Sequence, residues 1–182
     1  MRLRDTVKHW NTTEVERSAV YPCEHFAAPT YERYLRAVDV EADPSITFRW
    51  ICQLTVAPYS YDWLDNWGRR SPSVLTPGAE VLDVGQQFLI ARIVEFEPGR
   101  QITGVSTPRA SRLFGPITLT YQVSAAGGQG SRIVACMTVG ADSWAGRARR
   151  TLLGLGDLVM MRKQLLTLKF NAEASAASGV TL

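Results

Sequence analysis

The sequence predicts an α+β fold in which a curved antiparallel sheet packs against one long C-terminal helix. Between residues 87 and 139, β-forming segments with alternating apolar and polar residues are separated by turn residues, which is typical of antiparallel strands. From about Asp157 the apolar residues instead recur at helical spacing. With 182 residues, the chain is long enough for one domain that holds a core or an internal cavity.

The first elements precede this sheet. Residues 1–30 are polar and broken by prolines, so we expect an irregular arm with a short helix over 12–19. Alternating β-forming residues predict a strand over 34–41. Asp43 has the residue type of a helix N-cap, and the proline after it suits a first helical position, which predicts a helix over Pro44–Leu54.

The next segment, "APYSYDWLDNW", is dense in aromatic rings. Ser60 can cap a short helix over 61–67, on which Trp63 and Trp67 share one face. In one interpretation the rings form a pocket wall, and Asp62 orients a tyrosine hydroxyl. In the other the tryptophans belong to the core, and Asp62 interacts with the helix dipole and the free N–H groups of the first turn. The second interpretation suits Asp62 better, because acidic residues are common in first turns.

Four strands follow, two over 87–106 with a turn at 97–100 and two over 117–139 with a turn at 126–130. The first strand of the second pair has the cleanest alternation. We expect its apolar residues to face the core and its polar residues to face water; the two sets are Ile117, Leu119, Tyr121 and Val123, and Thr118, Thr120 and Gln122.

The C-terminal helix carries one apolar stripe, made by Leu158, Met161, Leu165, Leu168 and Ala172. Gly154 and Gly156 lie just before it and predict a break, so we expect one helix over 157–173. Residues 174–182 read as a flexible tail, which leaves 31–173 as a single domain after the arm.

Composition excludes several classes of function. The net charge of +3 does not indicate a nucleic-acid partner, and the short basic run "RARR" at 147–150 is typical of a solvated surface. No metal-ligand spacing or nucleotide-binding glycine motif is present, so we predict no metal and no cofactor. No apolar stretch follows the basic N-terminus, so we expect no secretory signal, and no apolar run reaches membrane-spanning length. Together with three scattered cysteines, of which Cys52 and Cys136 read as core residues, this predicts a reduced cytoplasmic compartment.

The order of elements resembles the START/Bet v 1-like superfamily, also called SRPBCC or polyketide cyclase-like. The stretches "YLRAVDVEADPSITFRWICQL", "YSYDWLDN" and "DLVMMRKQLLTLKFNAE" are similar to an uncharacterised bacterial branch of it. The resemblance implies a helix-grip fold: a curved antiparallel sheet wrapped around the long C-terminal helix, with two short helices after the first strand. It also implies a cavity between sheet and helix, where members bind lipids, sterols, polyketides or hormones, and where a few act as cyclases, dehydratases or hydrolases.

Candidate ligand-binding residues follow from that implied cavity: Tyr59, Tyr61, Trp63, Tyr121, Met137, Met161 and Leu165. Each of them can equally be plain core. Arg36 and Arg92 lie within strand patterns, and an outward, solvated arginine is the better interpretation of both. Both histidines, His9 and His25, lie in the arm, so the sequence places no catalytic histidine in the cavity.

Three hypotheses remain open. The first is a binding protein for a hydrophobic small molecule. The second is a polyketide cyclase- or dehydratase-like enzyme that uses tyrosine or aspartate as acid and base. The third is a protein–protein module with a collapsed cavity. The residues do not identify the ligand, the pathway or the oligomeric state.

Overall fold

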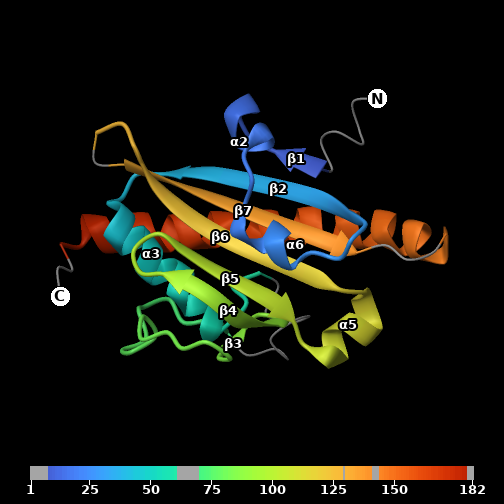
Figure 1. Cartoon of the computed structure of the whole chain (residues 1–182). Helices are drawn as coiled ribbons and strands as arrows, with labels where there is room; N and C mark the ends of the chain where they lie inside the picture. The colour runs from blue at the N-terminus through green and yellow to red at the C-terminus, as the bar shows by residue number, and fades with distance from the viewer. Residues whose placement is uncertain (1–7, 61–69, 129, 141–143, 180–182) are drawn as a thin grey trace.

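The computed structural model describes residues 8–60, 70–128, 130–140 and 144–179, with side chains in the last range described from Met160 onward. The N-terminal arm contains β1 (His9–Trp10), α2 (Glu14–Ser18) and the 3-10 helix η1 (Pro22–Phe26). The elements that follow are β2 (Tyr31–Val40), α3 (Pro44–Cys52), η2 (Gln53–Thr55), β3 (Gln87–Phe88), β4 (Ala91–Glu97), β5 (Gln101–Ser106), α5 (Pro108–Phe114), β6 (Ile117–Ala126), β7 (Gly130–Gly140) and α6 (Trp144–Ala177). Figure 1 shows the strands as one twisted sheet with α6 behind it.

The strands form one sheet in the order β1-β2-β7-β6-β5-β4-β3. All pairs from β2 to β3 along this order are antiparallel, which confirms the predicted sheet. The turn at 97–100 also lies where the sequence predicted it, and β6 and β7 end and begin at Ala126 and Gly130, the limits predicted for the second turn. The unexpected strand is β1, which pairs in parallel with β2 and extends the sheet at one edge. Its pairing partners are Leu35 and Arg36, so this part of the arm belongs to the sheet.

The predicted helix after the first strand is confirmed together with its cap. Asp43 accepts a hydrogen bond from the backbone N–H of Ser45 at 2.8 Å, and Pro44 is the first helical residue. The last turn tightens into η2, so Leu54 lies in a 3-10 turn rather than in the α-helix. The short helix predicted over 61–67 lies outside the described residues.

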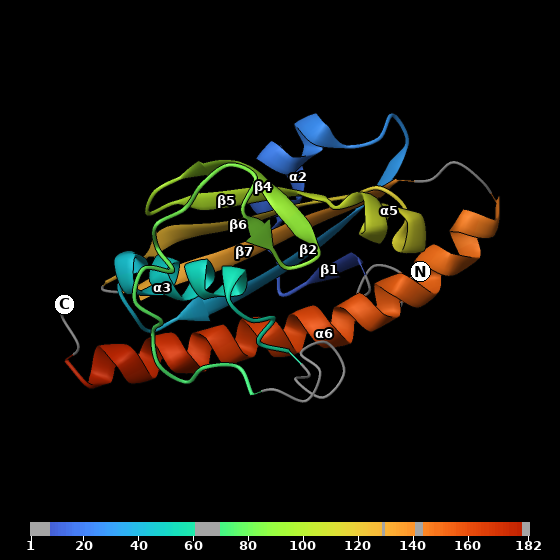
Figure 2. The ribbon, with the colours of Figure 1, turned by 90° about the horizontal axis from the view of Figure 1, so that it is seen from below.

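The C-terminal helix α6 is longer than predicted, because it begins at Trp144 and runs to Ala177. The break predicted at Gly154 and Gly156 was therefore wrong, and the helix continues into the segment predicted as a tail. Glycine in a helix interior costs only about 1 kcal/mol relative to alanine, which a helix of 34 residues can absorb. Figure 2 shows α6 running along the sheet on the face opposite α2.

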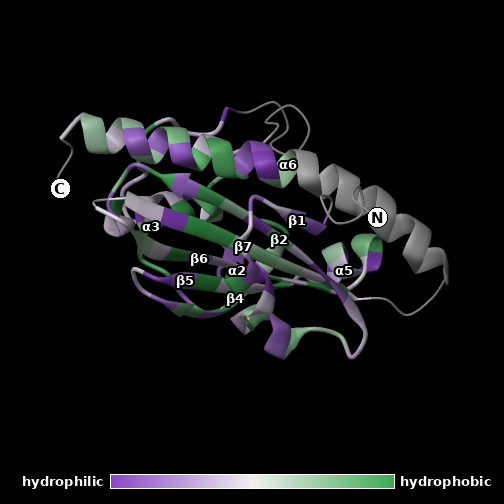
Figure 3. Cartoon of the chain, turned by 90° about the horizontal axis from the view of Figure 1, so that it is seen from above, coloured by the Kyte–Doolittle hydropathy of each residue, from purple (hydrophilic) through white to green (hydrophobic). Residues whose placement is uncertain are grey.

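The predicted apolar stripe of α6 is buried wherever its side chains are described. Met161, Leu165, Leu168 and Ala172 all belong to the main core. The side chain of Leu158 lies outside the described part. Figure 3 shows hydrophilic and hydrophobic residues alternating along the C-terminal half of α6, as expected for a helix with one face against a sheet.

The outer face of β6 is buried at Thr118 and Thr120, where the prediction of exposure to water was wrong, whereas Gln122 is partly exposed. Thr118 and Thr120 are both buried, because η1 of the arm lies over them. The backbone N–H of Cys23 donates to the hydroxyl of Thr120 at 2.9 Å, and the hydroxyl of Thr118 donates to the carbonyl of Cys23 at 2.7 Å. Alternation therefore indicated the two faces of the strand correctly, but polar residues here bind the arm rather than solvent.

The two strand arginines differ. Arg92 is exposed, as expected. Arg36 was expected to be solvated and is instead fully buried, with its guanidinium donating to the carbonyls of Lys8 and Leu35 at 2.9 Å each. It also lies 5.8 Å from the centre of the Tyr34 ring. Arg36 alternates with Leu35 and Ala37 and so shares the core-facing side of β2 with Tyr34 and Val38. Residue 8 of the arm supplies one of the acceptors for this cation.

Candidate functional site: a cavity under the C-terminal helix

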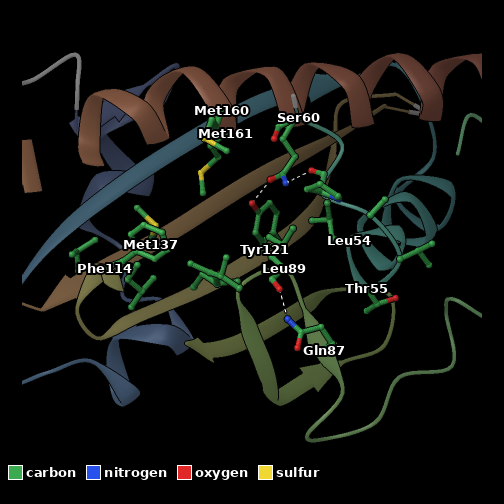
Figure 4. A pocket seen from close by; sticks show the side chains of 18 residues that line it. Leu54, Thr55, Ser60, Gln87, Leu89, Phe114, Tyr121, Met137, Met160 and Met161 are labelled. Carbon is green, nitrogen blue, oxygen red and sulfur yellow. Dashed lines mark hydrogen bonds between the residues drawn. The ribbon is translucent and has the colours of Figure 1, made fainter. Parts of the chain in front are cut away.

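A cavity of about 440 Å³ lies between α6 and the inner face of the sheet. Its volume falls within the range typical of small-molecule pockets. Figure 4 shows the side chains that line it, which are mostly apolar. They are Leu54, Thr55, Val56, Ala57, Pro58, Ser60, Gln87, Leu89, Ile90, Phe114, Ile117, Leu119, Tyr121, Met137, Val139, Met160, Met161 and Gln164.

The sheet supplies one wall of the cavity. On β6 the contributing residues are Ile117, Leu119 and Tyr121, which alternate with outward-facing threonines. The neighbouring strand β7 adds Met137, which pairs directly with Leu119 in the register. The wall thus follows from the period of two that the sequence shows, because every second side chain must face the same side of the sheet.

Three segments form a second side of the cavity: the chain after α3, the turn between β3 and β4, and the end of α5. The chain after α3 meets the β3–β4 turn through a hydrogen bond from the N–H of Leu89 to the carbonyl of Leu54 at 3.3 Å. The same turn meets the start of α5, because the N–H of Thr107 donates to the carbonyl of Ile90 at 3.1 Å. Phe114 at the end of α5 lines the cavity from this side.

One polar network crosses the cavity wall. The Tyr121 hydroxyl on β6 donates to the side-chain carbonyl of Gln164 on α6. The amide of Gln164 then donates to the carbonyl of Pro58 at 2.5 Å. Figure 4 shows both bonds, which join sheet, helix and loop. Tyr121 and Gln164 are both buried, and the Tyr121 ring also packs edge-on against Phe88 with ring centres 5.7 Å apart. Their polar atoms are therefore held in fixed positions beside the cavity.

Tyr59 lies next to the cavity but is oriented into the core. Its ring is buried and meets Trp50 edge-on at 6.0 Å. Its hydroxyl donates to the side-chain oxygen of Gln53 at 3.4 Å, and its backbone N–H donates to the hydroxyl of Ser71 at 3.2 Å. Its φ of 55° is in the left-handed region, which is uncommon for an aromatic residue and requires firm packing to hold it.

The structure brings together part of the predicted site. Tyr121, Met137 and Met161 all line the cavity. Leu165 lies one turn after Met161 but is fully buried within the core, where its neighbours include other residues of the stripe. Tyr61 and Trp63, together with Asp62 and Trp67, lie outside the described residues. Whether any of these side chains contacts a ligand stays a prediction.

Sequence reasoning missed several lining residues, among them Leu89, Phe114 and Gln164. Leu89 and Phe114 lie in a turn and at the end of a short helix, where no periodic pattern marks the buried side. Gln164 did carry a signal, because it lies three residues after Met161, on the same side of the helix. A polar residue at such a position indicates a buried hydrogen-bonding partner.

The site offers limited acid–base chemistry. Among the lining residues that the structure describes, the ionisable side chain is that of Tyr121. His9 lies in the edge strand β1 and His25 in η1, and neither residue lines the cavity. Within the described ranges there is also no cluster of three histidine, cysteine or acidic residues that could hold a metal ion. In the same ranges, none of the helices has the length and apolar character needed to cross a bilayer.

Comparison with solved structures identifies the fold. The Zhui aromatase/cyclase from Streptomyces sp. R1128 superposes with a TM-score of 0.52 at 13% identity, over 83% of this chain and 100% of that one. Norcoclaurine synthase from Thalictrum flavum, solved with dopamine and hydroxybenzaldehyde, has a TM-score of 0.49 at 10% identity over 84% and 90% of the chains. A member of the major latex protein family from Arabidopsis thaliana has a TM-score of 0.42 at 18% identity over 76% and 94%.

No family model matches the sequence, and no curated protein matches it. The structural likeness, at such low identity, is a likeness of fold. It agrees with the element order, the antiparallel sheet and the long C-terminal helix described above. The predicted resemblance is thereby confirmed at the level of fold: this chain has a helix-grip α+β fold like that of the Zhui aromatase/cyclase.

Proposed function

We propose that this protein binds a hydrophobic small molecule, such as a lipid or a polyketide, in the cavity under α6. The observation that carries the proposal is the cavity itself, about 440 Å³ of space with a mainly apolar lining inside an otherwise packed domain. Apolar cavities of this size exceed the small voids that packing normally leaves, so an apolar ligand gains by filling this one. The Tyr121–Gln164 network places polar atoms beside the cavity, where they can orient one polar group of the ligand.

An alternative proposal is an enzyme that resembles polyketide cyclases or dehydratases. The observation in its favour is the Tyr121 hydroxyl, an ionisable group that is fixed by Gln164 at the cavity wall. A binding protein needs this hydroxyl only for orientation, whereas an enzyme needs it for proton transfer. We favour the binding protein, because the described lining offers Tyr121 no second ionisable group to share acid–base work.

The experiment uses two tryptophan variants of the same helix. Met161→Trp fills the cavity from α6, whereas Leu166→Trp changes a partly exposed position outside the lining. Nile red, a neutral apolar dye, is titrated into both variants and the parent while its fluorescence is recorded. We expect the cavity variant to bind at least about tenfold more weakly, a loss of about 1.4 kcal/mol, and the control to match the parent.

Circular dichroism melts show that both variants are folded before they are compared. Native mass spectrometry of protein purified without detergent then searches for a co-purifying ligand, which should be lost from Met161→Trp and kept by Leu166→Trp. Equal dye binding by the two variants would show that the cavity is not the binding site. The domain limits at 31–173, the cytoplasmic location and the lack of a nucleic-acid partner stay predictions.

A further inference from the structure

The arm of the protein carries a cysteine that is fixed directly over the sheet. The backbone of Cys23 in η1 is held on both sides, by the hydroxyl of Thr120 at 2.9 Å and by the hydroxyl of Thr118 at 2.7 Å. These threonines lie on β6, two positions apart on the outer face. Cys23 therefore has a defined place on the sheet, although it belongs to a segment far away in the sequence.

A second cysteine lies directly beside it on the next strand. Cys136 of β7 pairs with Thr120 in the register of the sheet, so it adjoins the residue to which Cys23 is bound. The Cys23 sulfur lies 3.6 Å from the backbone carbonyl oxygen of Cys136, across a sequence separation of 113 residues. Both thiols are free and fully buried, and both residues belong to the small apolar cluster between arm and sheet.

The two thiols also differ in their acidity. The pKa of Cys23 is lowered, chiefly because the Cys136 side chain hydrogen-bonds to it, which outweighs the effect of burial. The pKa of Cys136 is raised by the same contact and by burial. The pair thus contains one thiol of lowered pKa and a second thiol close by, which is the arrangement that thiol–disulfide exchange requires.

We propose that Cys23 and Cys136 form an oxidisable dithiol, which reacts with a small-molecule disulfide to give a covalent link between the arm and the sheet. Nothing in the ligand-binding proposal requires this site, because it lies on the face of the sheet opposite α6. The link would hold in place the segment that covers Thr118, Thr120 and the apolar outer face of β7.

The reaction balances with oxidised glutathione as the oxidant. The Cys23 thiolate attacks one glutathione sulfur, which breaks the glutathione disulfide and releases one glutathione thiolate. The Cys136 thiolate then attacks the Cys23 sulfur of the mixed disulfide, forms the protein disulfide and releases the second glutathione. The two thiol protons pass to the two released thiolates. Two electrons move from the cysteine pair to the oxidant.

Access to the buried pair depends on opening of the arm. The arm is a short peripheral segment held to the sheet by a small set of hydrogen bonds and ion pairs, one of them to Arg132, so its opening requires less free energy than global unfolding. Cys52 provides the internal comparison. It lies in α3 within the main core, and burial raises its pKa to about 12, so it should stay reduced under the same conditions.

The test uses the full chain, incubated with oxidised glutathione and with reduced glutathione. Peptide mapping by mass spectrometry without reductant should find Cys23 linked to Cys136, and titration of thiols in denaturant should fall from three to one. The linked chain should melt at least about 5 °C higher, because the disulfide closes a long loop in the unfolded state. The mapping uses the unaltered sequence, so it does not depend on the folding of any variant.

Two variants sharpen the result. Cys52→Ala keeps the pair and should show the same link, with a thiol count that falls from two to none. Cys136→Ala removes the resolving thiol and should show either no reaction or glutathione bound to Cys23. Three free thiols after oxidation of the parent, or a link that involves Cys52, would overturn the proposal.

Discussion

Gln164 shows what one residue can decide in this fold. It lies between Met161 and Leu168 on the buried side of α6, where an apolar residue would pack without cost. Its amide instead joins Tyr121 on the sheet to Pro58 in the loop after α3. A buried amide is stable only when its donors and acceptors are satisfied, so the three residues depend on one another.

We therefore expect Tyr121→Phe to destabilise the protein by about 1–3 kcal/mol, because it removes the donor to a buried acceptor and little volume. Urea denaturation followed by circular dichroism measures the difference. Tyr31→Phe is the matched control, since its hydroxyl is exposed and bonds weakly to Glu24 at 3.4 Å. Equal midpoints for Tyr121→Phe and the parent would mean that this hydrogen bond does not contribute to stability.

At the scale of the element, α6 combines two kinds of buried surface. Met161 belongs to the cavity wall, and Leu165, one turn later, is fully enclosed in the core. One end of the apolar stripe thus lines the cavity, and the other end packs against side chains of the core. The sequence pattern does not change between the cavity and the core, because helical spacing shows which side of α6 is buried but not whether cavity or side chains lie against that side.

Truncation of the two residues should separate these environments. Leu165→Ala should cost about 2–5 kcal/mol, as expected when a cavity is created in a packed layer. Met161→Ala should cost clearly less, because one side of this side chain already faces space. Urea midpoints at pH 7 measure both. A larger loss for Met161→Ala than for Leu165→Ala would contradict the assignment of cavity and core.

The arm is a second element with a specific attachment. Arg132 on β7 bonds to Glu16 of α2 at 2.5 Å and to Asp39 of β2 at 2.7 Å. Burial raises the pKa of Glu16, but the hydrogen bonds from Arg132 and Thr13 outweigh burial, and the pKa lies below its ordinary value of 4.5. A lowered carboxyl pKa stabilises the fold above the unfolded value, and this contribution is lost as pH falls through the folded pKa.

Glu16→Gln should therefore lower the melting temperature at pH 7, and the difference from the parent should shrink as the pH falls below 4.5. Thermal melts between pH 7 and pH 3 measure it. Glu14→Gln changes an exposed carboxylate of the same helix and should have little effect at any pH. A difference that grows on acidification would have the wrong sign for this ion pair.

For the whole molecule, the main feature is that the sheet is covered on both faces. Figure 2 shows α6 and α3 on one face and α2 of the arm on the other. The cavity lies on the first face, and the second face is closed by the arm through Tyr21, Cys23 and the threonines of β6. Loss of the arm would expose this surface to water. Its polar groups could then bond to water, but its apolar groups would form an exposed patch.

Deletion of residues 1–27 should lower the melting temperature and promote self-association, because Leu35, Ala37 and Val134 lose their cover. Differential scanning calorimetry and size-exclusion chromatography measure the two effects. Removal of residues 178–182 is the control at the other terminus and should change neither. A shortened chain that melts and elutes like the parent would show that the arm is dispensable.

Several elements followed directly from the sequence. The strands β4 to β7, the turn at 97–100, the cap at Asp43 and the buried stripe of α6 depend on local patterns, and local patterns are present in the chain itself. Each reports the conformation of a few neighbouring residues and which side of them is apolar. For the same reason Tyr121, Met137 and Met161 could be named as residues of the inner face.

Other features depended on contacts between distant segments, which no local pattern records. The arm covers Thr118 and Thr120 and supplies an acceptor to Arg36, so polar residues that a single strand would present to water are buried. The helix passes through Gly154 and Gly156, since a small local cost is outweighed by packing along the rest of its length. By itself the sequence determined the strands β4 to β7, the helix α3 and the C-terminal half of α6, and which side of each is apolar. Only the tertiary structure decided what lies against that side, whether core, cavity or arm, because burial is a property of all the segments that meet at one place.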